Sequence, residues 1–164
     1  MSEFYSMVPK DRRANLEFRK WALHLGSESA EQRHELWMMC SRDILFYINT
    51  FGWLLEPRAT GDTPKVIPFL TYPYQDDAII RMQDAVGVRD VGIHKSRATG
   101  ATWMCLYLAD WFWRFKEWSQ IGLVSRTESA VDNPDDPDSL MSKLDFIREH
   151  VPVWLNPNDW ERKV

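Results

Sequence analysis

The order of apolar segments predicts an α/β fold: an incomplete parallel sheet with flanking helices, preceded by an α-helical N-terminal segment. Two short apolar segments, residues 88–94 and 120–124, have the composition of strands, and a long apolar helix is expected between them. Strands that alternate with long helices indicate a parallel sheet. The chain has 164 residues and 45% hydrophobic content, so one domain with a sizeable core is expected.

The N-terminal part, residues 1–56, is predicted to be a helical segment. Residues 10–20 are basic and are expected to form a helix with a solvated face, the alternative being a site for an acidic partner. The residues from Ser29 to Gln32 have the pattern of a capping box. The helix that begins there is expected to end near Gly52. Its amphipathic stripe has a spacing of four: Leu36, Cys40, Ile44 and Ile48.

The second part, residues 65–164, is expected to hold the sheet. A loop at 56–64 is followed by a predicted short strand at 65–70 and a helix at 75–86, which Gly87 ends. The strand at 88–94 then precedes the next helix.

That next helix, from Gly100 to Trp118, is apolar almost all round, so it is expected to be buried on most sides. Core packing explains its tryptophans better than a platform for stacking bases. After the strand at 120–124, an acidic turn leads into the last helix, with Asp136 expected as its N-cap and Pro137 as its first residue. The same acids could suggest a metal site, but turn and capping roles explain them better.

The composition excludes several classes of protein. The formal net charge is −4, which argues against a module that binds DNA through permanent contacts, because such modules are usually basic. Brief contact with DNA remains compatible with this charge. Cys40 and Cys105 lie in apolar stretches and are expected to be buried reduced thiols, with no zinc-ligand spacing. We expect no membrane association, because no apolar run is long enough to span a bilayer, and no secretion, because the N-terminus lacks a signal peptide.

The segment between the predicted strand 88–94 and the Gly100 helix is the most informative one. A loop in that context can bind an anion with its backbone N–H groups and the positive end of the helix. Against the usual pattern G-x-x-x-x-G-K-[ST], Gly100 aligns with the second glycine and Thr102 with the Mg²⁺-binding hydroxyl. Lys95 replaces the first glycine and Ala101 replaces the lysine. A lysine at the front of the loop could still reach the β- and γ-phosphates; an ordinary strand–loop–helix is the alternative.

At this loop the chain resembles the large terminase subunits of tailed viruses, whose deviant P-loop has the form K-[SA]-[RA]-x-x-G-x-[ST]. Every fixed position of that pattern is met over residues 95–102. Three further stretches are similar in order and spacing. They are residues 42–51 followed by Pro57 and Arg58, the Tyr72–Gln75 element that resembles the family's adenine-contacting glutamine, and residues 125–155.

The resemblance implies a P-loop NTPase-type ATPase domain that binds ATP and Mg²⁺ and drives double-stranded DNA into a capsid. It assigns phosphate-binding and catalytic roles to Lys95 and Arg97, and Mg²⁺ to Thr102. Tyr74 and Gln75 would contact adenine. The remaining residues would line the phosphates: Ser96, Ala98, Thr99, Gly100 and Ala101. The implied partners are the portal and the small terminase subunit, at the assembling capsid in the host cytoplasm. Self-association into a homo-oligomer is expected on a separate ground, because an incomplete sheet would leave apolar surface of the Gly100 helix exposed.

The chain departs from the family's pattern after residue 125. No apolar strand ending in adjacent acids follows, so the catalytic acid and the nuclease domain are missing, and residues 65–164 would be only the front part of the ATPase domain. We therefore expect no appreciable ATP hydrolysis by this chain alone. A non-catalytic assembly module derived from such a motor is the competing hypothesis. A helicase-like ATPase of another family is weaker, because it should have a lysine at position 101.

Overall fold

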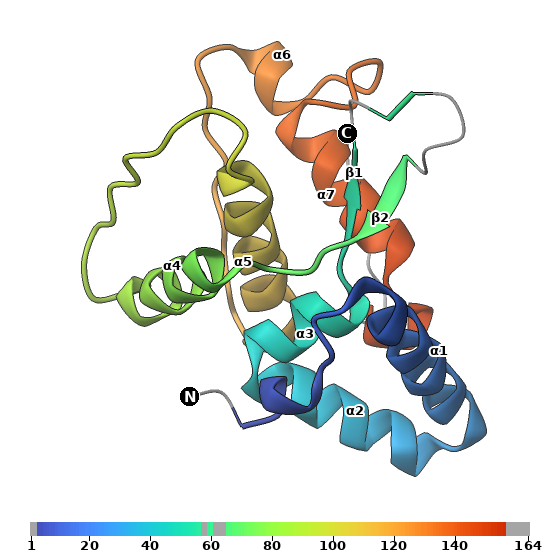
Figure 1. Ribbon diagram of the computed structural model, residues 1–164. Coiled ribbons are helices and arrows are strands. Elements are labelled where there is room, and N and C mark those ends of the chain that lie inside the picture. The colour runs from blue at the N-terminus through green and yellow to red at the C-terminus, as the bar shows by residue number, and fades with distance from the viewer. Residues whose placement is uncertain (1–2, 57–58, 61–64, 157–164) are drawn as a thin grey trace.

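The computed structural model describes residues 3–56, 59–60 and 65–156, and these residues are mostly helical (Figure 1). Pro57, Arg58 and most of the predicted 56–64 loop lie outside the described residues. The elements follow in the order η1 Tyr5–Met7, α1 Arg12–Glu28, α2 Ala30–Arg42, α3 Ile44–Phe51, β1 Trp53–Leu55, β2 Val66–Pro68, α4 Pro73–Ala85, α5 Ala101–Phe115, α6 Glu128–Val131, α7 Leu140–His150 and η2 Val153–Leu155.

The predicted parallel, P-loop-type sheet is wrong. The sheet of the described residues has two antiparallel strands, β1 and β2, with Leu54 opposite Ile67. Residues 88–94 and 120–124 do not form strands. Their apolar composition favours extended chain, but a ladder also requires a neighbouring strand, and neither segment has one among the described residues. Val88 and Val124 are accordingly 74% and 88% exposed.

The two segments take different courses past α5. Figure 1 shows residues 86–100 swinging out from the end of α4 before they return to the start of α5, whereas residues 116–127 run back along α5 toward α6. The predicted α4 helix and the stop at Gly87, which has a φ of 76°, are confirmed.

The predicted helix from Ser29 to Gly52 is divided in two at Asp43. The Ser29 cap is confirmed, since its hydroxyl accepts a hydrogen bond from the Gln32 N–H at 3.1 Å. The Asp43 carboxylate caps α3, and it also accepts the backbone N–H groups of Phe4 and Tyr5 at 3.0 and 2.8 Å. The apolar stripe continues through this break, so its spacing does not reveal it. Only the packing of the N-terminal residues against α3 does.

One hydrophobic core joins the two parts of the chain. Every residue of α3 is buried, and α5 packs against α3, α4 and α7. Trp111 is 1% exposed and donates its indole N–H to the Cys40 carbonyl oxygen at 2.8 Å, which supports core packing for the tryptophan-rich helix.

The helix ends at Phe115, however, and Trp118 beyond it is 95% exposed. Cys40 is buried as expected, whereas the expectation for Cys105 is wrong, because it is exposed.

A buried ion pair fixes α5 to its neighbours. Asp110 and Arg114 pair at 2.9 Å with both side chains fully buried, and the Tyr47 hydroxyl donates to Asp110 at 2.5 Å. Arg114 also donates to the Leu155 carbonyl oxygen at 2.9 Å. Burial by itself lowers the pKa of Arg114, yet Tyr47 and Asp110 raise it above its usual value. These contacts connect α3, α5 and η2.

The last helix begins later than predicted. Its N-cap is Ser139, whose hydroxyl accepts the Ser142 N–H at 3.2 Å, and Pro137 lies outside the helix. Asp136 accepts the Asp138 N–H at 2.9 Å in the preceding turn instead. Ser139 is 1% exposed, and α7 packs against α5.

Candidate functional site

Residues 95–100 form the loop that leads into α5. Ala98 and Gly100 have φ values of 60° and 77°, in the left-handed region where glycine is favoured and alanine is uncommon. α5 begins after Gly100 with no side-chain cap. Because the first N–H groups of a helix lack intrahelical partners, this end of α5 carries a partial positive charge.

Gln75 of α4 contacts this loop directly. Its side chain is buried, and its Nε2 donates a hydrogen bond to the Thr99 carbonyl oxygen at 3.0 Å. Its Oε1 accepts the Tyr72 N–H at 2.9 Å, which caps α4. The approach to the loop is close: a Cβ at Gly100 would lie 2.9 Å from Gln75 Nε2. The structure therefore brings together the two segments that the resemblance placed in one site.

Two exposed tyrosines stand beside Gln75. Tyr72 and Tyr74 are 63% and 55% exposed, and their rings are stacked with centroids 5.8 Å apart and planes 6° apart. Pro73 is the first residue of α4 and separates them in sequence. The sequence interpretation assigned a role to Tyr74 and none to Tyr72; a tyrosine on each side of a helix-starting proline was the available signal.

The charged residues of the loop are available to a ligand. Lys95 and Arg97 are exposed, as are Ser96 and Ala98, and neither cation forms a side-chain hydrogen bond or ion pair with another described residue. Within the loop, the Thr99 hydroxyl donates to the Ser96 carbonyl oxygen at 3.5 Å.

The first two residues of α5 point to different environments. Thr102 is exposed, whereas Ala101 is only 7% exposed and belongs to the core cluster. A lysine at position 101 would have to leave the core before it could reach the loop. The empty lysine position of the usual motif is therefore consistent with the packing of this helix start.

The described residues offer little beyond Thr102 for a metal ion. Among them, no group of three His, Cys, Asp or Glu side chains comes together. The acids of the 133–138 turn form local backbone contacts, as when Asp136 accepts the Asp138 N–H. A Mg²⁺ ion at Thr102 would need most of its oxygen ligands from phosphate and water, as Mg²⁺ often does in nucleotide sites.

A polar cluster holds the start of α4 against the N-terminal segment. The Tyr5 hydroxyl donates to Asp76 at 2.7 Å, and Thr71 also donates to this carboxylate. Lys10 lies 3.7 Å from Asp76 and donates to the Thr71 carbonyl oxygen at 2.8 Å. Burial raises the pKa of Asp76, with Thr71 and Lys10 opposing the rise, and burial lowers the pKa of Lys10. The cluster fixes the residue next to Gln75 and was not predicted.

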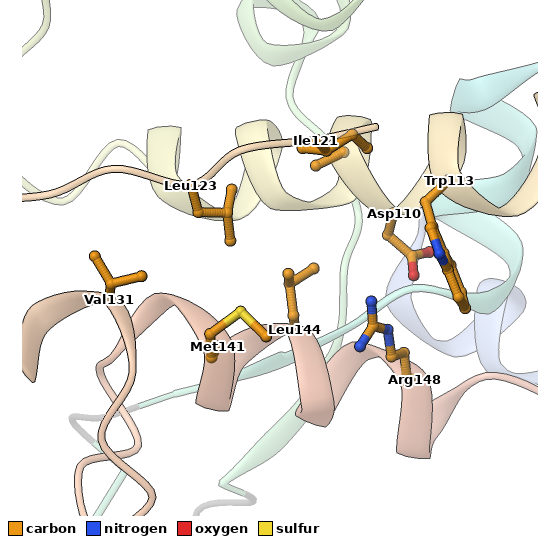
Figure 2. Close-up of a pocket in the computed structure, with 9 residues that line it drawn as sticks. Asp110, Trp113, Ile121, Leu123, Val131, Met141, Leu144 and Arg148 are labelled. Carbon is orange, nitrogen blue, oxygen red and sulfur yellow. The ribbon is translucent and has the colours of Figure 1, made fainter. Parts of the chain in front are cut away.

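A separate cavity of about 340 Å³ lies between α5, α7 and the returning segment. Figure 2 shows Ile121 and Leu123 of that segment facing Met141 and Leu144 of α7, with Asp110 and Arg148 at one end. Asp110 is already paired with Arg114, and Arg148 stacks 4.5 Å from the Trp113 ring. The charged groups thus serve packing between helices, and none of the predicted site residues lines this cavity.

In comparisons with protein-family models, curated protein sequences and solved structures, the chain has no match. In the part of the chain that the structure describes, no helix is long and apolar enough to cross a membrane.

Proposed function

We propose that this chain binds ATP at the loop of residues 95–102 and is the ATP-binding portion of a DNA-packaging motor of the large terminase type. The observation that carries the proposal is the hydrogen bond from Gln75 to the Thr99 carbonyl oxygen. The resemblance paired a glutamine element with a phosphate loop, and the two are 24 residues apart in sequence yet in direct contact.

The arrangement suits a nucleoside triphosphate. The start of α5 and the exposed cations Lys95 and Arg97 would hold the phosphates, since helix N-termini and basic side chains both favour anions. Tyr72 and Tyr74 offer exposed aromatic faces next to Gln75, where a base could stack. Bound Mg²⁺, with Thr102 as one ligand, would offset the charge of the phosphates.

The proposal for this chain concerns binding, with hydrolysis assigned to the complete motor. Phosphoryl transfer to water needs an acid that completes Mg²⁺ coordination and a group that orients the water. Lys95 and Arg97 would neutralise the charge that develops on the transferred phosphoryl group. Coupling to DNA movement, and the portal and small terminase subunit as partners, belong to the same proposal.

Calorimetric titration of the 164-residue chain with ATP and Mg²⁺ tests the proposal. Lys95→Ala should weaken ATP binding by about ten- to a hundredfold, because a charge-assisted contact contributes about 1.5–3 kcal/mol. Lys20→Ala is the matched control, since Lys20 is an exposed lysine on α1 that pairs with Glu17. Equal ATP affinity in folded wild-type and Lys95→Ala proteins would refute the assignment of the loop.

A second candidate function, a non-catalytic assembly module, is favoured by exposed apolar residues. Val88, Trp118 and Val124 are 74%, 95% and 88% exposed, on the extended segments that flank α5. An association interface would remove such side chains from water. Light scattering over a concentration series should then show self-association that is reduced in a Trp118→Ser, Val124→Ser double variant. A wild-type chain that stays monomeric throughout would remove the support for self-association.

A further inference from the structure

We infer that Gln75 acts on the loop rather than on the base of a nucleotide: it is a positioning residue that holds the Thr99–Gly100 peptide in its phosphate-binding conformation. The inference rests on the proposed function and changes the role that the resemblance gave to Gln75. It predicts that Gln75 contributes to the affinity for any polyphosphate, whether or not a base is attached.

The side-chain amide of Gln75 is buried and hydrogen-bonded within the protein. Gln75 is 4% exposed, so its amide is turned into the protein. Its Oε1 is engaged by the Tyr72 N–H and its Nε2 by the Thr99 carbonyl oxygen. An amide that reads adenine must present both groups to the base, whereas here each group already has a protein partner and the side chain is buried, which leaves little of the amide for a base. The exposed groups beside it are the rings of Tyr72 and Tyr74.

The carbonyl oxygen that Gln75 contacts lies at a point where it can control the orientation of the loop backbone. Thr99 lies between the two left-handed residues Ala98 and Gly100. Its carbonyl group belongs to the peptide that leads into α5, so a hydrogen bond to this oxygen fixes the orientation of the Gly100 N–H. A Cβ at Gly100 would come within 2.9 Å of Nε2 and displace the amide. Glycine is therefore favoured at position 100 by the φ of 77° and also by the contact with Gln75.

Gln75 is itself held in place by the polar cluster at the start of α4. The next residue, Asp76, receives hydrogen bonds from Tyr5 and Thr71, and Lys10 lies 3.7 Å away. This cluster immobilises the first turn of α4. Gln75 can thus transmit the rigidity of the α4 start to a loop whose own side chains are mostly exposed.

The decisive comparison uses two ligands, ATP and inorganic tripolyphosphate, each with Mg²⁺. Gln75→Met keeps the length of the side chain and removes both hydrogen bonds without adding charge. It should weaken both ligands by about the same factor, about tenfold for one lost contact. Tyr74→Leu is the comparison variant and should weaken ATP while leaving tripolyphosphate unchanged. If Gln75→Met weakened the affinity for ATP but left the affinity for tripolyphosphate unchanged, the inference would be overturned.

A measurement without any ligand separates this inference from the proposed function. The ¹⁵N heteronuclear NOE of Thr99 and Gly100 in the free chain should fall in Gln75→Met, because the loop gains fast motion once its anchor is removed. Gly100→Ala breaks the same contact from the other side, so the two changes together should lower the NOE little further than either alone. Unchanged NOE values in Gln75→Met would overturn the inference. Wild-type protein that binds neither ligand would instead overturn the proposed function.

Discussion

Replacing Gly100 by alanine tests the contact at the start of α5 through its effect on stability. The backbone at position 100 is left-handed, a conformation that costs alanine about 1–2 kcal/mol. Alanine also restricts the unfolded chain more than glycine does, and this stabilises the folded protein by about 0.4–1 kcal/mol. The methyl group would also lie 2.9 Å from Gln75 Nε2 and break the hydrogen bond to Thr99, which adds about 1 kcal/mol. We expect Gly100→Ala to lower the free energy of unfolding by about 2 kcal/mol.

Two other glycines supply matched controls. Gly87 has a φ of 76°, almost the value of Gly100, but a Cβ there would meet nothing within 4 Å. Gly87→Ala should therefore show the backbone cost alone, about 1 kcal/mol less than Gly100→Ala. Gly92 has no left-handed conformation and equally open space, so Gly92→Ala should be close to neutral. Urea unfolding of the three variants gives the free energies directly.

The difference in the free energy of unfolding between Gly100→Ala and Gly87→Ala shows whether the Gln75–Thr99 hydrogen bond contributes to stability. If Gly100→Ala and Gly87→Ala destabilise the chain equally, the methyl group at position 100 displaces nothing, and the Gln75–Thr99 contact contributes no stability. In thermal unfolding the expected 2 kcal/mol corresponds to a Tm lowered by about 4–8 °C for a chain of this length.

The remaining predictions concern the core, the polar cluster and the start of α5. Asp110→Ala should destabilise the chain by about 3–5 kcal/mol in urea unfolding, because it leaves Arg114 buried without its partner, whereas Asp77→Ala at an exposed pair should cost under about 1 kcal/mol. The raised pKa of Asp76 means that the folded chain binds this proton more tightly. Its contribution to stability is thus present at low pH and is lost as the pH rises through the raised pKa. Wild-type protein should therefore lose stability relative to Asp76→Asn as the pH rises from below the usual aspartate pKa through the raised pKa of Asp76, and a constant difference would contradict this. Ala101→Lys should lower the Tm and give no gain in ATP affinity, because position 101 belongs to the core; tighter binding would mean that the loop alignment is wrong.

Several parts of the candidate site could be predicted from the sequence. A glycine at position 100 before an apolar helix predicted the start of α5, and the loop composition placed Lys95 at its front. The resemblance predicted that Gln75 would lie near the loop, although the residues are distant in sequence. The neighbouring Tyr72 was not assigned a role, because its stacking on Tyr74 depends on the cap of α4. The ATP-binding role of these residues stays a prediction.

The parallel sheet was the principal error, and residues 88–94 and 120–124 show why. Their β-branched and apolar side chains describe a local preference for extended backbone, and both segments lie outside the helices and strands of the structure. A strand, however, is defined by hydrogen bonds to another strand, and no local pattern specifies where that partner lies. In the same way, the continuous stripe from Leu36 to Ile48 gave no sign that Asp43 would turn its carboxylate toward the N-terminal segment.

By itself the sequence determined the local features: the Ser29 cap, the stop at Gly87, the buried face of α5 and an exposed basic loop in front of it. These depend on residues within one or two turns of each other, where capping, φ preference and apolar periodicity act directly. Only the tertiary structure decided that Gln75 donates a hydrogen bond to the loop and that Asp110 and Arg114 form a buried pair beside Tyr47. It also decided that residues 88–94 and 120–124 pair with no strand among the described residues. Each of these depends on contacts between distant segments, and such contacts form only where the packing of the whole core brings the segments together.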